Sequence, residues 1–126
     1  MSVVLDASAA YEMLAGDDWD ASIREVYEFL APDLIIAELL NARWKIARSG
    51  NVAPGIDPTL DFLARLRIMP SLPYAAVATR LAERLDHPVY DCFYVAVAQQ
   101  ENAQLLTADT RLMRKLRTHK LGALLA

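Results

Sequence analysis

Hydrophobic positions along the chain follow two spacings, and each spacing predicts a different kind of element. Short apolar runs between Pro, Gly or polar residues are typical of buried strands, whereas apolar residues three and four positions apart predict one face of a helix. The expected strands are residues 3–5, 34–35, 67–69 and 104–107, with a further short one at 121–125. The expected helices are residues 6–14, 21–30, a segment that ends near 48, 59–66, 74–85, 90–101 and 109–117. Because strands and helices alternate, the sequence predicts a three-layer α/β/α fold around a central, mainly parallel sheet.

Glycine and proline mark the ends of several of these elements. The first helix is expected to stop near Gly16, and Pro32 is expected to end the second helix. Residues 51–58 contain two prolines and a glycine, which predicts a loop. Pro88 disfavours helical geometry at the residue before it and therefore separates two neighbouring helices.

Composition is consistent with one compact domain. The 126 residues are 55% hydrophobic and 23% charged, so we expect a single domain over residues 1–126 rather than a disordered chain. No basic stretch precedes the apolar residues at the N-terminus, and the longest uncharged apolar run, residues 92–98, is far short of the roughly 20 residues that span a bilayer. These features argue against a membrane protein and predict a cytoplasmic one. Cys92 has no second cysteine to pair with and is expected to be a small buried residue.

Two aspartates follow predicted strands and precede predicted helices. Asp6 comes directly after the first strand, and Asp109 follows the strand that ends at Thr107. Because the carboxyl ends of parallel strands form the crevice where ligands bind, both carboxylates are expected at the same end of the sheet. Asp6 could instead cap the next helix, although Ala9 replaces the Glu or Gln of a full capping box. The hydroxyl of Thr107 would suit a neighbouring carboxylate or water, and a polar strand end explains it equally well.

Two further acids lie beside apolar runs. Glu38 interrupts the apolar run over residues 34–40, where a buried carboxylate needs a partner or a metal. Asn41 and Lys45 follow it on nearly the same helical face, so a structural salt bridge from Lys45 is an alternative reading. Asp91 precedes a strongly apolar helical segment, where it is either a helix cap or a second charge beside the core.

Acidic residues at strand ends and helix starts would repel one another if they met in an empty cleft. They are Asp6, Glu38, Asp91 and Asp109. Converging carboxylates therefore require cations, and oxygen ligands without a pair of cysteines or histidines suit Mg²⁺ or Mn²⁺. His87 and His119 stand outside the four acidic segments and form no i, i+4 pair, so neither is expected to be a ligand. The net charge of −3 argues mildly against a general basic surface for nucleic acid, although bound cations would change the local field.

The segments around these acids resemble the four acidic motifs of PIN-domain nucleases. The matching segments are residues 4–8, 37–42, 90–96 and 106–109. Each motif is short, but their order, spacing and apolar contexts together are fairly specific, and the resemblance runs essentially from end to end. It implies that the four acids are catalytic and bind the metal, that Thr107 supplies an accompanying hydroxyl, and that Asn41 is a supporting polar residue.

The compact length is similar to that of VapC-type toxins. This resemblance implies a metal-dependent endoribonuclease that leaves a 5′-phosphate, an RNA substrate, a cognate antitoxin protein and a homodimer. Substrate phosphates could be guided by Arg43 and Lys45, on the helix that carries Glu38, or by Arg111 near the end of the chain. A solvated helix face explains these basic residues equally well.

Other readings of the acids fit less well. A phosphate-handling enzyme of the haloacid-dehalogenase type needs a second aspartate two residues after the first, and Ser8 stands there. A phospho-receiver domain needs an acceptor at the end of a central strand, whereas Asp57 lies in the predicted loop. The serious rival is a catalytically inactive RNA- or protein-binding module on the same fold, against which the intact set of acids counts.

Overall fold

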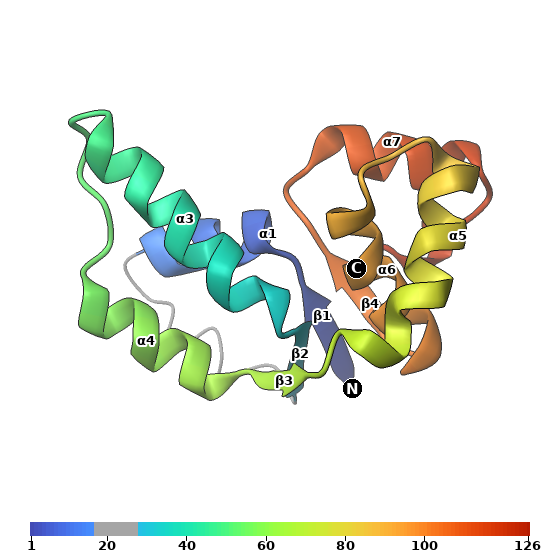
Figure 1. Cartoon of the computed structure of the whole chain (residues 1–126), viewed down its shortest axis with the longest axis horizontal. Coiled ribbons are helices and arrows are strands. Elements are labelled where there is room, and N and C mark those ends of the chain that lie inside the picture. Colours follow the sequence, from blue (N-terminus) through green and yellow to red (C-terminus); the bar gives the residue numbers. More distant parts are fainter. Residues whose placement is uncertain (17–27) are drawn as a thin grey trace.

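Parallel strands form the centre of the computed structural model, which describes residues 1–16 and 28–126 (Figure 1). The strands are β1 (Ser2–Leu5), β2 (Glu28–Pro32), β3 (Arg67–Met69) and β4 (Gln104–Leu106). Their order across the sheet is β3-β2-β1-β4, and each neighbouring pair is parallel. The carboxyl ends of the strands therefore share one edge of the sheet.

Helices cover both faces of this sheet (Figure 1). On one side lie α1 (Ala7–Ala15), α3 (Leu34–Arg48) and α4 (Ile56–Arg65). On the other lie α5 (Ala75–Leu85), α6 (Val89–Gln100) and α7 (Thr110–Thr118). Short 3₁₀ helices occupy Leu72–Tyr74 (η1) and Gly122–Leu124 (η2). The predicted three-layer α/β/α fold with a parallel central sheet is confirmed.

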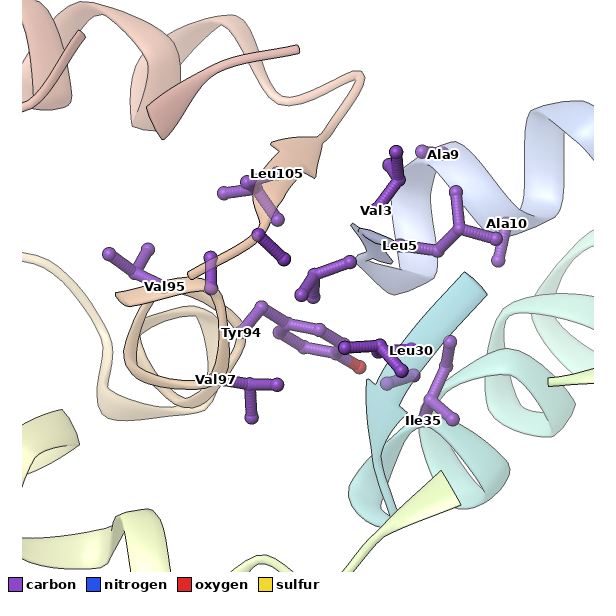
Figure 2. Packing of buried hydrophobic residues seen from close by; sticks show 14 of the residues in the cluster. Val3, Leu5, Ala9, Ala10, Leu30, Ile35, Tyr94, Val95, Val97 and Leu105 are labelled. Carbon is purple, nitrogen blue, oxygen red and sulfur yellow. The ribbon is translucent and has the colours of Figure 1, made fainter. Parts of the chain in front are cut away.

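A continuous apolar core joins the three layers at β1. Leu5 of this strand is fully buried, and so are Leu30 of β2 and Ile35 of α3. Tyr94 of α6 is also fully buried, and Figure 2 shows its ring pointing toward Leu30. Burial of one Leu or Ile side chain contributes roughly 1.5–3 kcal/mol, so these contacts fix α3 and α6 on opposite faces of the sheet.

The region around β2 differs from the prediction. The helix expected over 21–30 is wrong at residues 28–30, which lie in β2, while residues 21–27 lie outside the described residues. The strand expected at 34–35 is also wrong, because Pro32 ends β2 and α3 begins at Leu34. A strand that is buried on both faces has a continuous apolar run without alternation, so periodicity alone does not separate it from a buried helix.

Two other boundaries need correction. The short strand expected at 121–125 is a 3₁₀ helix, and only Leu125 forms an isolated bridge, with Leu105 of β4. The helix expected to start at 59 begins at Ile56. Pro58 is tolerated in its first turn, because the N–H groups of that turn have no hydrogen-bond partner within the helix. Across the described part of the chain, none of the helices is both long and apolar enough to cross a membrane.

Candidate active site

Asp6 lies at the junction of β1 and α1 and is almost completely buried. Its Oδ1 accepts the backbone N–H of Ala9 at 2.9 Å, so the side chain does cap α1. The same oxygen accepts the Ser8 hydroxyl at 2.6 Å, and Oδ2 accepts the hydroxyl of Thr107. Because a carboxylate offers about four acceptor positions, capping α1 leaves room for another ligand.

Ser8 and Thr107 tie the ends of β1 and β4 together around this carboxylate. Each hydroxyl donates to Asp6 and accepts a backbone N–H: Ser8 from Ala108 at 3.0 Å, and Thr107 from Asp109 at 3.0 Å. The parallel register pairs Leu5 with Leu106, which brings the two strand ends together. Thr107 therefore lies where the sequence predicts a hydroxyl beside the acids.

Glu38 enters the site from α3, one turn after the helix begins. Its Oε1 accepts the hydroxyl of Tyr94 at 2.7 Å, across the sheet from α6. Ile35 and Leu39 on the same helix are fully buried, so the core face of α3 sets the direction of Glu38. The alternative salt bridge from Lys45 is not among the ion pairs of the described residues, and the partner of Glu38 is a phenol instead.

Asp91 and Asp109 both lie near Nε2 of a buried histidine, His87. Asp91 is in the first turn of α6, and its Oδ2 lies 2.7 Å from Nε2 of His87. Asp109 caps α7, where its Oδ1 accepts the backbone N–H groups of Arg111 at 3.0 Å and Leu112 at 3.1 Å. Its other oxygen lies 4.0 Å from the same His87 nitrogen. One nitrogen of His87 and one oxygen from each aspartate lie within 4.8 Å of one another.

Two of the acids, Asp6 and Glu38, have raised pKa values. Burial raises the pKa of the Asp6 carboxyl above its ordinary value, the hydrogen bonds from Ser8, Thr107 and Ala9 oppose this, and the charge of Asp91 raises it further. Burial also raises the pKa of the Glu38 carboxyl, and the charges of Asp91 and Asp6 act in the same direction. Asp6, Glu38 and Asp91 thus act on one another electrostatically, and Asp109 joins this cluster through its distance to His87 and Asp91.

The chemistry of this cluster fits a divalent cation. Within residues 1–16 and 28–126, none of the four acids has an ion pair with a lysine or arginine. Asp6 is buried and the other three acids are half-buried, and such carboxylates need a source of positive charge when no lysine or arginine supplies it. Oxygen donors of this kind are those that Mg²⁺ and Mn²⁺ prefer.

An open cleft of about 560 Å³ lies beside the acids, between α1 and α3. Ser8 and Glu38 line its inner part, and Asn41 and Lys45 line it farther along α3. Asn41 is exposed and lines the cleft three residues after Glu38 on α3. Of the four acids, Glu38 lines the cleft itself, and the cleft also reaches Ser8 and Ala108 at the ends of β1 and β4.

The other basic residues singled out from the sequence differ in their surroundings. Arg43 donates through Nε to the carbonyl oxygen of Pro54 at 2.6 Å, which ties α3 to the segment before α4. Arg111 is exposed and follows Asp109 at the start of α7. Lys45 and Arg111 therefore have more freedom to meet a phosphate than Arg43, whose guanidinium has a structural contact.

Three residues of the site were missed by the sequence reasoning. Ser8 served there only to exclude another enzyme class, and Tyr94 was one residue of an apolar helix. His87 lies outside the acidic segments in the sequence and was not expected to be a ligand, but its Nε2 lies 2.7 Å from Asp91 Oδ2 in the structure. The sequence did contain a signal for His87. It stands four residues before Asp91 and directly before Pro88, so the chain turns into α6 with both side chains near the start of that helix.

Comparison with known proteins agrees with this geometry. The model of the PIN domain family matches residues 3–117. Ribonuclease VapC3 from Pyrobaculum aerophilum is 27% identical over 124 residues, which cover 91% of this chain and 95% of that protein.

Solved structures show the same architecture. The crystal structure of PAE2754 from Pyrobaculum aerophilum superposes with a TM-score of 0.78 at 27% identity and covers 98% of this chain and 89% of its own. A toxin–antitoxin complex from Klebsiella pneumoniae has a TM-score of 0.64 at 12% identity, over 88% of this chain and 89% of the other, which shows a shared fold. Because the family model covers nearly the whole chain, from the first strand to the last helix, this protein belongs to the PIN domain family.

Proposed function

We propose that this protein is a metal-dependent endoribonuclease and the toxin of a VapBC-like toxin–antitoxin pair. The observation that carries the proposal is the convergence of Asp6, Glu38, Asp91 and Asp109, from four separate parts of the chain, at one edge of the sheet. The name of the relative VapC3 supports ribonuclease activity, and its similarity covers almost the full length of both proteins.

The four acids would hold Mg²⁺ or Mn²⁺, and their own hydrogen bonds prepare them for it. Such a cation supplies Lewis acidity, which activates water for attack on phosphorus and offsets the charge that develops on the phosphate. Ser8 and Thr107 fix the Asp6 carboxylate, and Tyr94 fixes Glu38. Because these donors orient the carboxylates before any ligand arrives, little reorganisation is needed when RNA binds.

The cleft between α1 and α3 is the proposed path of the RNA strand. Lys45 and Asn41 line it, and Arg111 lies at the start of α7 beside Asp109. Basic and polar groups beside the acidic cluster would bind the flanking phosphates, while the four acids act at the scissile one. Arg43 would contribute less because its Nε already binds Pro54.

Cleavage of RNA by the purified protein tests the proposal. We expect hydrolysis with Mg²⁺ or Mn²⁺ that leaves a 5′-phosphate and stops when EDTA exceeds the metal. Undiminished cleavage in excess chelator would refute the metal mechanism. RNA binding without cleavage, under every metal condition, would instead identify the catalytically inactive binding module.

An antitoxin partner and a homodimer complete the proposed function. The resemblance to VapC-type toxins implies both, and a small reading frame for a DNA-binding protein directly upstream would support the pairing. Sedimentation equilibrium tests self-association: we expect a dimer in the micromolar range. A monomer across that range, with and without metal, would remove the dimer from the proposal.

A further inference from the structure

His87 is a buried polar side chain that contacts the acidic cluster and has no role in the proposed function so far. It lies between α5 and α6, its side chain is only 2% exposed, and Nε2 faces Asp91 Oδ2 at 2.7 Å. The same nitrogen is 4.0 Å from Asp109 Oδ2. The ring therefore stands against two acids that come from different helices.

The main chain around His87 is held firmly, which fixes where the ring can point. Its N–H donates to the carbonyl oxygen of Ala82 at 3.2 Å, a bond that spans five residues and closes the C-terminal end of α5. Asp86 before it has a left-handed backbone with φ of 49°, and Pro88 after it has a restricted φ. The side chain thus reaches Asp91 from a backbone that has little freedom to move away.

The hydrogen-bond pattern of the ring assigns its tautomer. Within the described part of the chain, the buried Nδ1 of His87 has no hydrogen-bond partner. A hydrogen on Nε2 satisfies Asp91 and leaves Nδ1 as a bare acceptor, whereas a hydrogen on Nδ1 would bury an unpaired donor and place a lone pair against the carboxylate. His87 is therefore a donor to Asp91.

A donor cannot use the same nitrogen as a metal ligand. While Nε2 carries its hydrogen toward Asp91, its lone pair is not available to a cation, and Nδ1 points elsewhere in the ring. A hydrogen bond to one oxygen of Asp91 restricts the rotation of the carboxylate and leaves its second oxygen free of that bond. This is the arrangement by which residues behind a metal site orient its ligands.

We propose that His87 is a positioning residue, which donates its Nε2–H to Asp91 and thereby holds this carboxylate beside that of Asp109, ready for a divalent cation. This inference rests on the proposed function, since it requires that the acids bind metal. Loss of such a hydrogen bond behind a metal ligand typically weakens metal binding by about 10- to 100-fold.

Mn²⁺ binding to two variants tests the proposal without relying on activity. His87→Leu removes the donor at similar size, and His87→Gln offers an amide N–H near the position of Nε2. We expect Mn²⁺ dissociation constants, measured by titration calorimetry, to rise about 10- to 100-fold for His87→Leu and to stay within about threefold for His87→Gln. His119→Gln, at the opposite end of α7 from Asp109, is the matched control and should bind as wild type does.

Cleavage kinetics separate positioning from a purely structural role. Raising Mn²⁺ should restore most of the His87→Leu rate, because the defect lies in metal affinity, and circular dichroism should show an unchanged fold. Mn²⁺ binding by His87→Leu as tight as wild type overturns the inference. So does nitrogen coupling from histidine in pulsed electron paramagnetic resonance of Mn²⁺-loaded wild type, because it would make His87 a ligand.

A metal-free measurement decides the matter even if His87→Leu does not fold. In ¹⁵N-histidine-labelled wild type, we expect the NMR signals of a buried ring protonated at Nε2. A ring protonated at Nδ1 alone would overturn the inference. The two proposals can fail separately. If wild type and His87→Leu bind Mn²⁺ and cut RNA equally well, this inference alone is refuted. If wild type neither binds metal nor cuts RNA, the proposed function is refuted and this inference with it.

Discussion

Single side chains in this protein carry folding and chemistry at once. Asp6 caps α1 through Oδ1, yet the same carboxylate is held by Ser8 and Thr107 at the edge of the sheet. Asp109 likewise caps α7 and faces His87 with its second oxygen. The sequence leaves open whether Asp6 is a helix cap or a metal ligand. The two roles do not exclude each other, because one carboxylate has acceptor positions for both.

Asp6→Asn separates these two roles. Asparagine keeps the size of the side chain and caps helices as well as aspartate does, so α1 should form normally. The variant loses one charge of the proposed metal site, and we expect cleavage to slow roughly 10²- to 10³-fold, equivalent to about 3–4 kcal/mol of transition-state stabilisation. Single-turnover RNA cleavage at fixed Mg²⁺ measures the loss.

Thermal melting supplies the control for the same variant. Without metal, removing one of several repelling carboxylates should leave the melting temperature unchanged or raise it, while the increment on adding Mg²⁺ should shrink. Asp57→Asn, which changes an exposed aspartate in the first turn of α4, should alter neither. An Asp6→Asn variant that melts well below wild type yet cuts RNA at the wild-type rate would make Asp6 a helix cap alone.

At the scale of elements, the sequence predicts where a strand passes into a helix better than it predicts which side chains from distant elements meet. The repeated order of strand, aspartate and helix at Asp6 and Asp109 predicts two adjacent strand ends, because periodicity and capping chemistry are local properties. The contact of His87 with Asp91 is local, since the two residues are four positions apart, and the spacing could have indicated it. The contact of Tyr94 with Glu38 joins residues 56 positions apart, and its distance depends on how α6 packs against the sheet opposite α3. Local patterns do not contain that information.

The region from β2 to α3 shows why the sequence pattern predicts the wrong elements there. Phe29 and Leu30 are both buried although they are neighbours, because helices cover both faces of the sheet at β2. In α3, by contrast, Ile35 is fully buried and Ile36 is 42% exposed, which is the behaviour of neighbouring residues on an amphipathic helix. Two successive isoleucines have the same β propensity, so only their burial shows which element they belong to.

Alanine substitutions at these two isoleucines test the placement of α3. Ile35→Ala leaves a cavity between α3 and the sheet and should lower the free energy of unfolding by about 2–5 kcal/mol. Ile36→Ala removes the same atoms from a partly solvated position and should cost less than about 1 kcal/mol. Urea unfolding followed by circular dichroism measures both. Equal losses, or a larger loss for Ile36→Ala, would contradict the orientation of α3.

At the scale of the whole molecule, an acidic cluster inside an acidic chain creates a conflict between folding and function. The chain carries a net charge of −3, and Asp6, Glu38 and Asp91 add their mutual repulsion at one edge of the sheet. Burial that orients Asp6 and Glu38 also disfavours their charged forms. The conflict is relieved when these groups take up protons or, under the proposed function, divalent cations.

The stability of the metal-free protein should therefore fall as pH rises through the acid range of the site. The pKa values of Asp6 and Glu38 are raised in the folded state, mainly by burial, above ordinary values of 3.8 and 4.5. The folded state then binds protons more tightly than the unfolded chain, so this contribution to stability is complete below the ordinary values and is lost as pH rises through the raised ones.

Melting of wild type and of a double variant, Asp6→Asn with Glu38→Gln, isolates this effect. As pH rises to 7 from the ordinary pKa values of about 4, without metal, the melting temperature of wild type should drop relative to that of the double variant, which lacks both titrations. Adding Mn²⁺ should raise the melting temperature of wild type more at pH 7 than at pH 5, because the cation binds the deprotonated carboxylates, and it should raise that of the double variant much less. If wild type and the double variant kept the same difference in melting temperature across this pH range, Asp6 and Glu38 would titrate normally, and the repulsion attributed to the cluster would be absent.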